Sequence, residues 1–171
     1  MVDSCVGVLA MGRRAKRVRD SAMVVARWMM PSDANPYGNV FAGAIMRYID
    51  EVAAMVAMRH AERNVVCAHA DEVDFFEPVH IGELLVLKAS VNHVGRTSME
   101  VGVRVEAENP VKGTRRHVAS AYLVMVALDE NGRPTEVPDI IPETEEEKRR
   151  YREAEERRKA RLARRRRPHM H

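Results

Sequence analysis

The sequence lacks the signals of several common protein classes. Its 171 residues include only two cysteines. Cys5 and Cys67 lie far apart without metal-ligand spacing, so free thiols in a reducing compartment are expected rather than a disulfide. No window approaches the roughly 18 consecutive apolar residues of a membrane span. The short apolar run over residues 5–11 precedes its basic residues, the reverse of a secretory signal. We therefore expect a soluble, cytoplasmic protein.

Charge is distributed unevenly along the chain. The formal net charge is +3, but residues 142–167 contain twelve Lys or Arg and seven Asp or Glu. Any attraction for anions that depends on bulk charge is therefore expected in this segment. Glutamates come first and arginines follow, which suits a helix dipole. The sequence predicts an exposed helix packed by one edge, with a solvated tail over the last ten residues as the alternative.

Hydrophobic patterning predicts one α+β domain built from a sheet and a long helix. The helix is expected over residues 42–62, because five apolar side chains recur there with helical spacing: Ile45, Ile49, Val52, Ala53 and Val56. Five strands are expected, over residues 21–30, 65–76, 83–94, 99–108 and 116–128. Since one helix cannot cover both faces of such a sheet, we expect the other face to be buried by oligomerisation.

Three regions follow from these patterns. We expect a flexible N-terminal extension over residues 1–18, the folded domain over 19–141 and a charged helix or tail over 142–171. The length suits a single domain with its own core, and no internal repeat is present.

The chemistry-bearing residues gather between Asn35 and Asp50. The chain has no Gly-rich phosphate loop, no Gly-x-Ser-x-Gly motif and no His-Glu-x-x-His pair, so a hydrolase would need a carboxylate to activate water. Asp50 can act as general base or nucleophile, and Asn35 can orient water or a carbonyl. The N–H groups of Gly43 and Ala44, at the helix start, can stabilise an oxyanion. Taken singly, each residue has a more frequent structural role as a turn former, a solvated carboxylate or a cap.

The same unit closely resembles the hot-dog acyl-CoA thioesterases of the cytosolic acyl-CoA hydrolase type. Their segment Asn-Pro-x-Gly-x-x-Phe-x-Gly, followed seven residues later by Asp, occurs here from Asn35 to Asp50. The likeness continues through Val73-Asp-Phe-Phe-Glu-Pro-Val79, Val94-Gly-Arg-Thr-Ser-Met99 and Asp129-Glu-Asn-Gly132, and covers about residues 20–160. One departure is Ala42-Gly43, where many relatives have paired glycines.

The resemblance implies a fold, a reaction and a set of site residues. It implies an antiparallel sheet wrapped around one long helix, with subunits joined edge to edge so that Asn35 of one faces Asp50 of the next. The reaction would be hydrolysis of fatty acyl-CoA to fatty acid and CoA without metal or other cofactor. The assembly would be a dimer or a homohexamer built as a trimer of dimers. CoA would contact Gly95, Arg96, Thr97 and Ser98. Because Phe75 and Phe76 alternate sides, one is expected in the core and the other in the acyl channel, and Met46 is expected either in that channel or in the core.

Two other functions are weighed against hydrolysis. The chain could be a non-catalytic module that binds acyl-CoA, or nucleic acid through its arginine-rich tail. That tail mixes in glutamates and lacks interleaved aromatic residues, so a nucleic-acid partner is not expected. A membrane is not expected either, because no apolar window is long enough to span one. Hydration of an acyl thioester usually pairs a histidine with the acidic residue, and no histidine lies between Asn35 and Asp50. Acyl chain length stays open.

Overall fold

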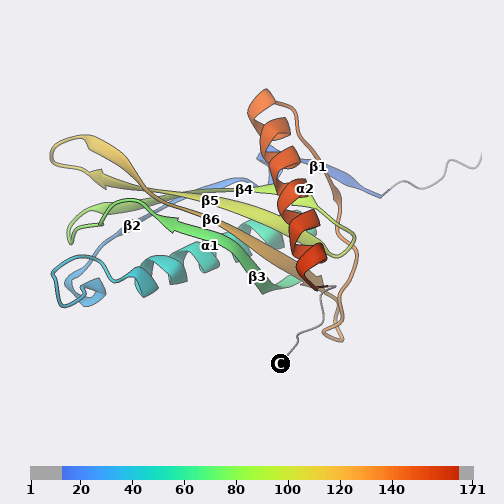
Figure 1. The fold of residues 1–171 in the computed structure, drawn as a ribbon, viewed down its shortest axis with the longest axis horizontal. Helices are drawn as coiled ribbons and strands as arrows, with labels where there is room; N and C mark the ends of the chain where they lie inside the picture. Colours follow the sequence, from blue (N-terminus) through green and yellow to red (C-terminus); the bar gives the residue numbers. More distant parts are fainter. Residues whose placement is uncertain (1–12, 166–171) are drawn as a thin grey trace, which may run out of the picture.

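A long helix lies inside a curved antiparallel sheet in the computed structural model, which describes residues 13–165 (Figure 1). The helix is α1 (Ala42–Ala61). The sheet has the order β2-β4-β5-β6-β3. Its strands are β2 (Met23–Trp28), β3 (Asn64–Phe75), β4 (Leu84–Val94), β5 (Ser98–Asn109) and β6 (Thr114–Leu128). The predicted α+β arrangement of a sheet wrapped around one helix is confirmed.

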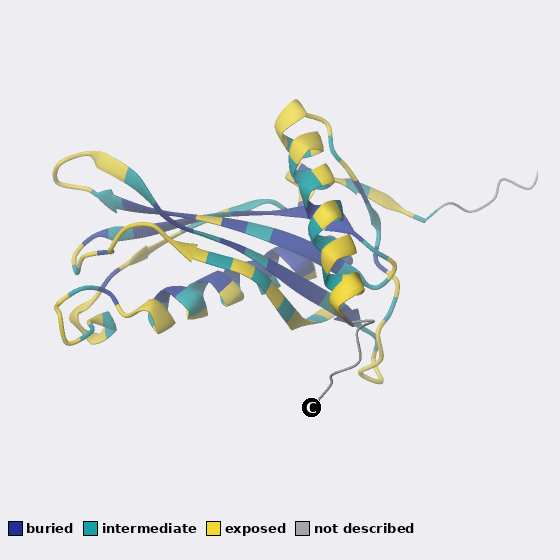
Figure 2. Cartoon of the chain, viewed as in Figure 1, coloured by how far each residue is buried: buried dark blue, intermediate teal, exposed yellow. Residues whose placement is uncertain are grey.

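The core lies between α1 and the concave face of the sheet (Figure 2). Ile49, Ala53 and Val56 of the predicted helix stripe have no exposed surface. Alternation along β5 places Val101 and Val105, also fully buried, on the same inner face. Burying an apolar side chain of this size stabilises the fold by about 2 kcal/mol. The spacing of the apolar residues therefore fixes which face of each element is turned inward.

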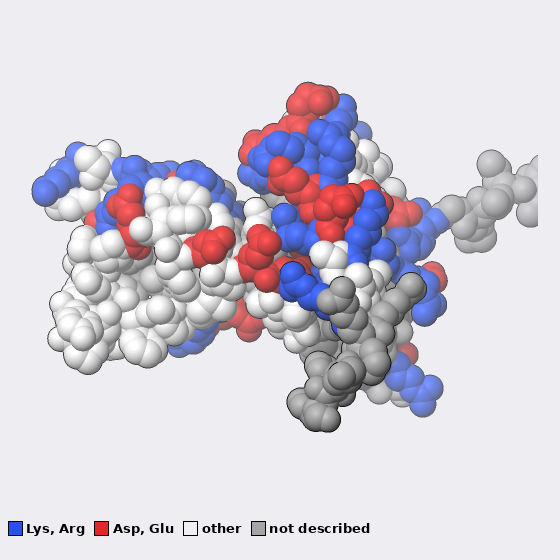
Figure 3. All heavy atoms as spheres, in the orientation of Figure 1, with Lys and Arg blue, Asp and Glu red and all other residues white. Residues whose placement is uncertain are grey.

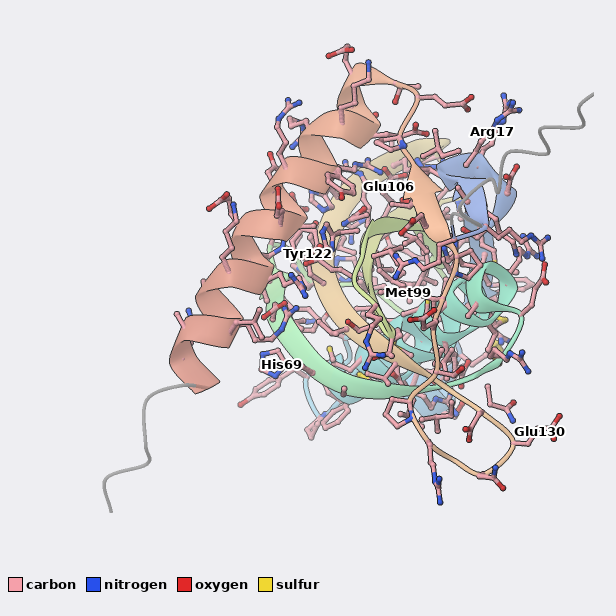
Figure 4. All side chains as sticks on the ribbon, turned by 90° about the vertical axis from the view of Figure 1, so that its right-hand side faces the viewer. Arg17, His69, Met99, Glu106, Tyr122 and Glu130 are labelled. Carbon is pink, nitrogen blue, oxygen red and sulfur yellow. The ribbon has the colours of Figure 1, made fainter. Side chains whose placement is uncertain are left out.

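A second helix, α2 (Glu145–Arg165), lies across the opposite face of the sheet (Figures 1 and 4). Ala154 is 1% exposed, and the Tyr151 ring lies 4.8 Å from that of His93 on β4. The helix predicted from the charge order is thus confirmed through Arg165, and residues 166–171 of the alternative tail lie outside the described part. The sheet face expected to need a second subunit is covered in part by α2.

The N-terminal segment is tied to the end of the folded domain. Strand β1 (Ala15–Arg17) pairs in parallel with β7 (Asp139–Ile141), and Lys16 Nζ donates to the Arg59 carbonyl at 2.9 Å. Residues 13–18 of the expected flexible extension are therefore ordered, while residues 1–12 lie outside the described range. Short 3-10 helices occur at Val18–Asp20 and Pro31–Asp33.

No helix within residues 13–165 is long and apolar enough to cross a membrane.

Candidate active site

The loop before α1 is held by the side chain of Asn35. Its Oδ1 accepts the N–H groups of Tyr37 at 2.9 Å and Asn39 at 3.1 Å. The loop is closed by Gly38, whose φ of 82° favours glycine. Asn39 in turn bridges to His80, just before β4. Because Oδ1 is used by the loop, the Nδ2 group of Asn35 is left as the donor that can reach a substrate.

The start of α1 offers backbone donors beside this loop. The amides of Ala44 and Ile45 both donate to the Phe41 carbonyl, at 2.9 and 3.3 Å. The expectation that Ala44 supplies a free donor is therefore corrected, because its N–H already closes the first turn. Within residues 13–165, the N–H groups of Ala42 and Gly43 have no acceptor, so these two can stabilise a developing negative charge.

Gly43 leaves room for the ring of Phe41. A Cβ at residue 43 would lie 2.6 Å from Cε1 of that ring, closer than carbon atoms approach. The ring thus lies over the helix start, and a side chain at residue 43 would displace this exposed ring.

A shallow pocket of about 300 Å³ joins the Asn35 loop to the end of β3. Its lining includes Asn35, Ile45, Phe75, Phe76 and Val79. Phe75 is 45% and Phe76 56% exposed, so the prediction that one of them packs in the core is wrong. The reason is their position: β3 ends at Phe75 and is an edge strand, with no further strand beside it among residues 13–165. Met46 packs against the core and does not line this pocket.

Asp50 lies on α1 away from the Asn35 pocket. It is exposed and follows Gly43 by seven residues, which corresponds to about 10 Å along a helix axis. Its carboxylate faces Cys67 of β3: burial first, and then the charge of Asp50, raise the pKa of the Cys67 thiol. One chain therefore does not bring the two predicted catalytic residues together.

The turn expected to contact CoA connects β4 to β5. The amide of Gly95 donates to the Ser98 carbonyl at 2.8 Å, while the carbonyls of Arg96 and Thr97 accept from Val137 and Ala127. The turn follows β4, whereas the Asn35 loop is tied to His80, before β4. Eleven residues of strand span about 35 Å. The two features therefore lie at opposite ends of the same subunit.

Several buried polar groups escaped sequence reasoning. Glu100 and Glu106 alternate with the core valines of β5, which predicts solvated side chains, yet they are only 4% and 7% exposed. Arg157 of α2 pairs with Glu100 at 2.7 Å, and Lys88 pairs with Glu106 at 2.7 Å. Alternation identifies the outer face of a strand, but it carries no information about a helix that later covers that face. The sequence likewise predicts only a free thiol at Cys67. It does not show that Cys67 lies opposite Asp50, because that position depends on how β3 packs against α1.

Comparisons with known proteins agree on one family. The thioesterase superfamily model matches residues 37–114. The chain is 41% identical over 129 residues to the uncharacterized acyl-CoA thioester hydrolase YkhA of Bacillus subtilis, and the match covers 75% of each chain. It is 36% identical over 125 residues to the human cytosolic acyl coenzyme A thioester hydrolase but spans only 33% of that protein.

Solved structures of similar sequence share the whole architecture. An apo-hexameric acyl-CoA thioesterase has a TM-score of 0.86 at 44% identity, covering 88% of this chain and 97% of its own. The acyl-CoA hydrolase of Staphylococcus aureus, solved with butyryl coenzyme A and coenzyme A, has a TM-score of 0.83 at 38% identity, covering 88% and 92%. Alanine variants of that hydrolase have been solved at an asparagine, at an aspartate fifteen residues later and at a threonine seventeen residues beyond the aspartate.

Proposed function

Because this chain belongs to the thioesterase superfamily, as an acyl-CoA thioester hydrolase of the hot-dog fold, we propose that it hydrolyses fatty acyl-CoA at a site shared by two subunits. Asp50 of one subunit supplies the carboxylate, and the loop of Asn35 in its neighbour supplies the hydrogen-bond donors. The observation that carries this proposal is the separation of the two groups within one chain. Asn35 lies beside Phe75 at one end of β3, whereas Asp50 faces Cys67 towards the other end.

Pairing of two β3 strands along their edges would bring Asp50 of one subunit close to the Asn35 loop of the other. The strand is twelve residues long, and its outer edge is unpaired within residues 13–165. Exposed strand edges are templates for pairing with another chain, and Val66 is 47% exposed here. Antiparallel pairing about the midpoint of Asn64–Phe75 places Cys67 opposite the partner's Glu72. That position is about 10 Å from the partner's Phe75, beside the partner's Asn35 loop.

The residue spacing supports the same assignment. Asn35, Asp50 and Cys67 are separated by fifteen and seventeen residues. These are the separations of the three positions changed to alanine in the Staphylococcus aureus hydrolase. Cys67 stands where that protein has a threonine, and both side chains can donate a hydrogen bond to a carboxylate.

The chemistry follows from these groups. Asp50 takes a proton from water as the water oxygen attacks the thioester carbonyl carbon. The Nδ2 group of the partner's Asn35 and the amide of the partner's Gly43 donate hydrogen bonds to the oxyanion that forms. The carbonyl is restored when the C–S bond breaks and CoA leaves as a thiolate that is then protonated. Direct attack by Asp50 would instead form an anhydride, and single-turnover hydrolysis in labelled water places the label in the Asp50 carboxylate when water opens this anhydride at the Asp50 carbonyl.

The assembly is proposed to go beyond a dimer. One similar thioesterase is hexameric, and three dimers of the kind described above would form such a particle. The cytoplasm, where acyl-CoA and CoA circulate, is the proposed location.

Mixed subunits test the shared site directly. Asp50→Ala and Asn35→Ala are each expected to lower kcat for acyl-CoA by about 100-fold. Thermal unfolding should be unchanged in Asp50→Ala and somewhat lower in Asn35→Ala, which loses two hydrogen bonds that hold the loop. Refolding the two variants together produces hybrid dimers in which one site carries both substitutions and the other carries neither. Activity should then return to about one quarter of the wild-type value, measured as free CoA with a thiol reagent. Hybrids that form but stay inactive would show that both residues act within one chain.

A further inference from the structure

Helix α2 places Arg158, a cation with no carboxylate partner among residues 13–165, beside the turn between β4 and β5. Arg158 is half-buried, and its Nε lies 3.7 Å from the position that a Cβ on Gly95 would occupy. Other basic side chains of α2 are paired: Arg149 with Glu153, Arg157 with Glu100 and Arg161 with Asp71. Arg158 forms no ion pair with any residue of the described part of the chain.

Arg158 is held at this place by the packing of α2. The guanidinium of the preceding residue, Arg157, lies 3.8 Å above the centre of the Tyr122 ring. It also donates two hydrogen bonds to the buried Glu100 carboxylate, at 3.2 and 2.7 Å. Figure 4 shows Tyr122 of β6 directly beneath the helix. These contacts hold α2 in one orientation about its own axis. That orientation places Arg158 beside the turn between β4 and β5.

The turn itself offers unused hydrogen-bond donors. The N–H groups of Arg96 and Thr97 have no acceptor within residues 13–165. The Ser98 hydroxyl lies 3.1 Å from the Cβ position of Gly95, on the same side as Arg158. A side chain at residue 95 would therefore enter the space between a hydroxyl and a guanidinium. The Arg96 side chain is 78% exposed, and its nearest carboxylate, that of Glu136, is 3.9 Å away.

The charge of Arg158 also acts on a buried side chain beside the turn. His93, which precedes it on β4, is 7% exposed. Burial first, and then the charge of Arg158, lower the pKa of His93, although Glu155 acts in the opposite direction. In Figure 3 charged side chains gather over α2, while the half of that face farther from the helix is mostly neutral.

The family resemblance already implies that the turn Gly95–Ser98 contacts CoA; we propose that Arg158 of α2 adds a guanidinium to this turn and binds the phosphate groups of CoA, which makes α2 part of the substrate site. The identity of the ligand rests on the proposed function. CoA carries a pyrophosphate and a ribose phosphate, and a guanidinium binds phosphate oxygens through two parallel N–H groups. The free backbone N–H groups of the turn carry partial positive charge, so they add fixed hydrogen-bond donors for the same phosphate oxygens. Arg158 thus determines affinity for the CoA portion, while Asp50 and Asn35 act on the thioester.

The kinetic test compares two arginines of the same helix. Arg158→Gln is expected to raise KM for acyl-CoA by about 10-fold or more, the effect of losing one charge-assisted hydrogen bond, and Arg158→Lys should fall between. The matched control is Arg152→Gln, at an exposed position of α2 with no ion pair to a residue in 13–165, which should leave KM unchanged. An acyl-pantetheine thioester lacks all the phosphates, so its KM should be the same for wild type and Arg158→Gln.

Three results would overturn the proposal. An equal rise of KM for acyl-CoA and acyl-pantetheine would show that Arg158 acts only through the structure of α2, and an unchanged KM for acyl-CoA would show no role. Calorimetric titration with CoA measures binding without hydrolysis. In this titration the dissociation constant of Arg158→Gln for CoA should rise by the same factor as its KM for acyl-CoA. Absence of hydrolysis by the wild type, with CoA binding and its dependence on Arg158 intact, would overturn the proposed function alone. Inorganic phosphate that binds as tightly as CoA would show a general anion site instead.

Discussion

Asn35 uses the two ends of its side-chain amide for different purposes. Its oxygen accepts two backbone N–H groups and so shapes the loop, while its nitrogen is the end that we propose donates to the thioester. The sequence predicts an asparagine in a turn, because Asn before Pro favours that structure. Which atom folds the loop depends on the position of Asn39, and this becomes visible only once the chain has closed on itself.

His60 makes the stability of the fold depend on pH. The side chain is fully buried, its Nε2 donates to the Pro138 carbonyl at 2.9 Å, and Nδ1 has no partner in the described part of the chain. Burial first, and then Lys16, lower the pKa of His60 below its ordinary value of 6.5, against the opposing hydrogen bond to Pro138. Below that value the unfolded chain takes up a proton that the folded chain resists, so stability is lost as the pH falls.

We expect the free energy of unfolding, measured with urea, to fall between about pH 7.5 and 5.5, with His60 contributing about 1 kcal/mol. His60→Gln keeps a donor for the Pro138 carbonyl but does not titrate, so its dependence on pH should be weaker. Some dependence will remain, because the pKa of His93 is also lowered. Identical slopes in the two proteins would mean that His60 is not responsible.

Helix α2 shows what a pattern of charges reveals about an element and what it does not. The order of glutamates and arginines predicted the helix, because charge order acts locally on the helix dipole. The same pattern could not show which arginines are solvated. Arg157 and Arg161 have side chains only 15% and 11% exposed, since each meets an acidic residue brought by the sheet from a distant part of the sequence.

Removing the guanidinium that anchors α2 should destabilise the protein strongly. Arg157→Met leaves Glu100 buried without its cation, and we expect a loss of about 3 kcal/mol in the free energy of unfolding. The double variant Arg157→Met with Glu100→Met replaces both charges by apolar groups, so most of the loss should be recovered. Urea titrations of the three proteins measure this. Equal stability of wild type and Arg157→Met would show that the pair does not hold the helix.

The sheet and its central helix could be predicted from the sequence, whereas the arrangement of the site and the position of α2 could not. The sheet and α1 followed from periodicity, because period two and period 3.6 each identify a buried face. The halves of the site are different: the distance between Asn35 and Asp50 depends on where the loop and the strand edge lie in space. Periodicity gave no sign that α2 would occupy part of the face expected to bind another subunit.

A charge placed on the edge of β3 tests the assembly. Val66→Lys should prevent edge pairing, as lysines do on natural edge strands, so the protein should sediment as a smaller species with little hydrolytic activity. Val24 on β2, the other edge of the sheet, is 69% exposed, and Val24→Lys should keep both size and activity. A fully active Val66→Lys protein of unchanged size would exclude β3 as the interface.

The exposed edge of β3 has a consequence for the behaviour of the enzyme at low concentration. If each site needs two chains, dilution below the dissociation constant of the pair removes activity without unfolding either chain, and the loss is steeper than the loss of protein. Acyl-CoA that binds across both chains favours the pair by mass action. Substrate would then act as its own assembly signal, and a diluted enzyme would show a lag that shortens as substrate is raised.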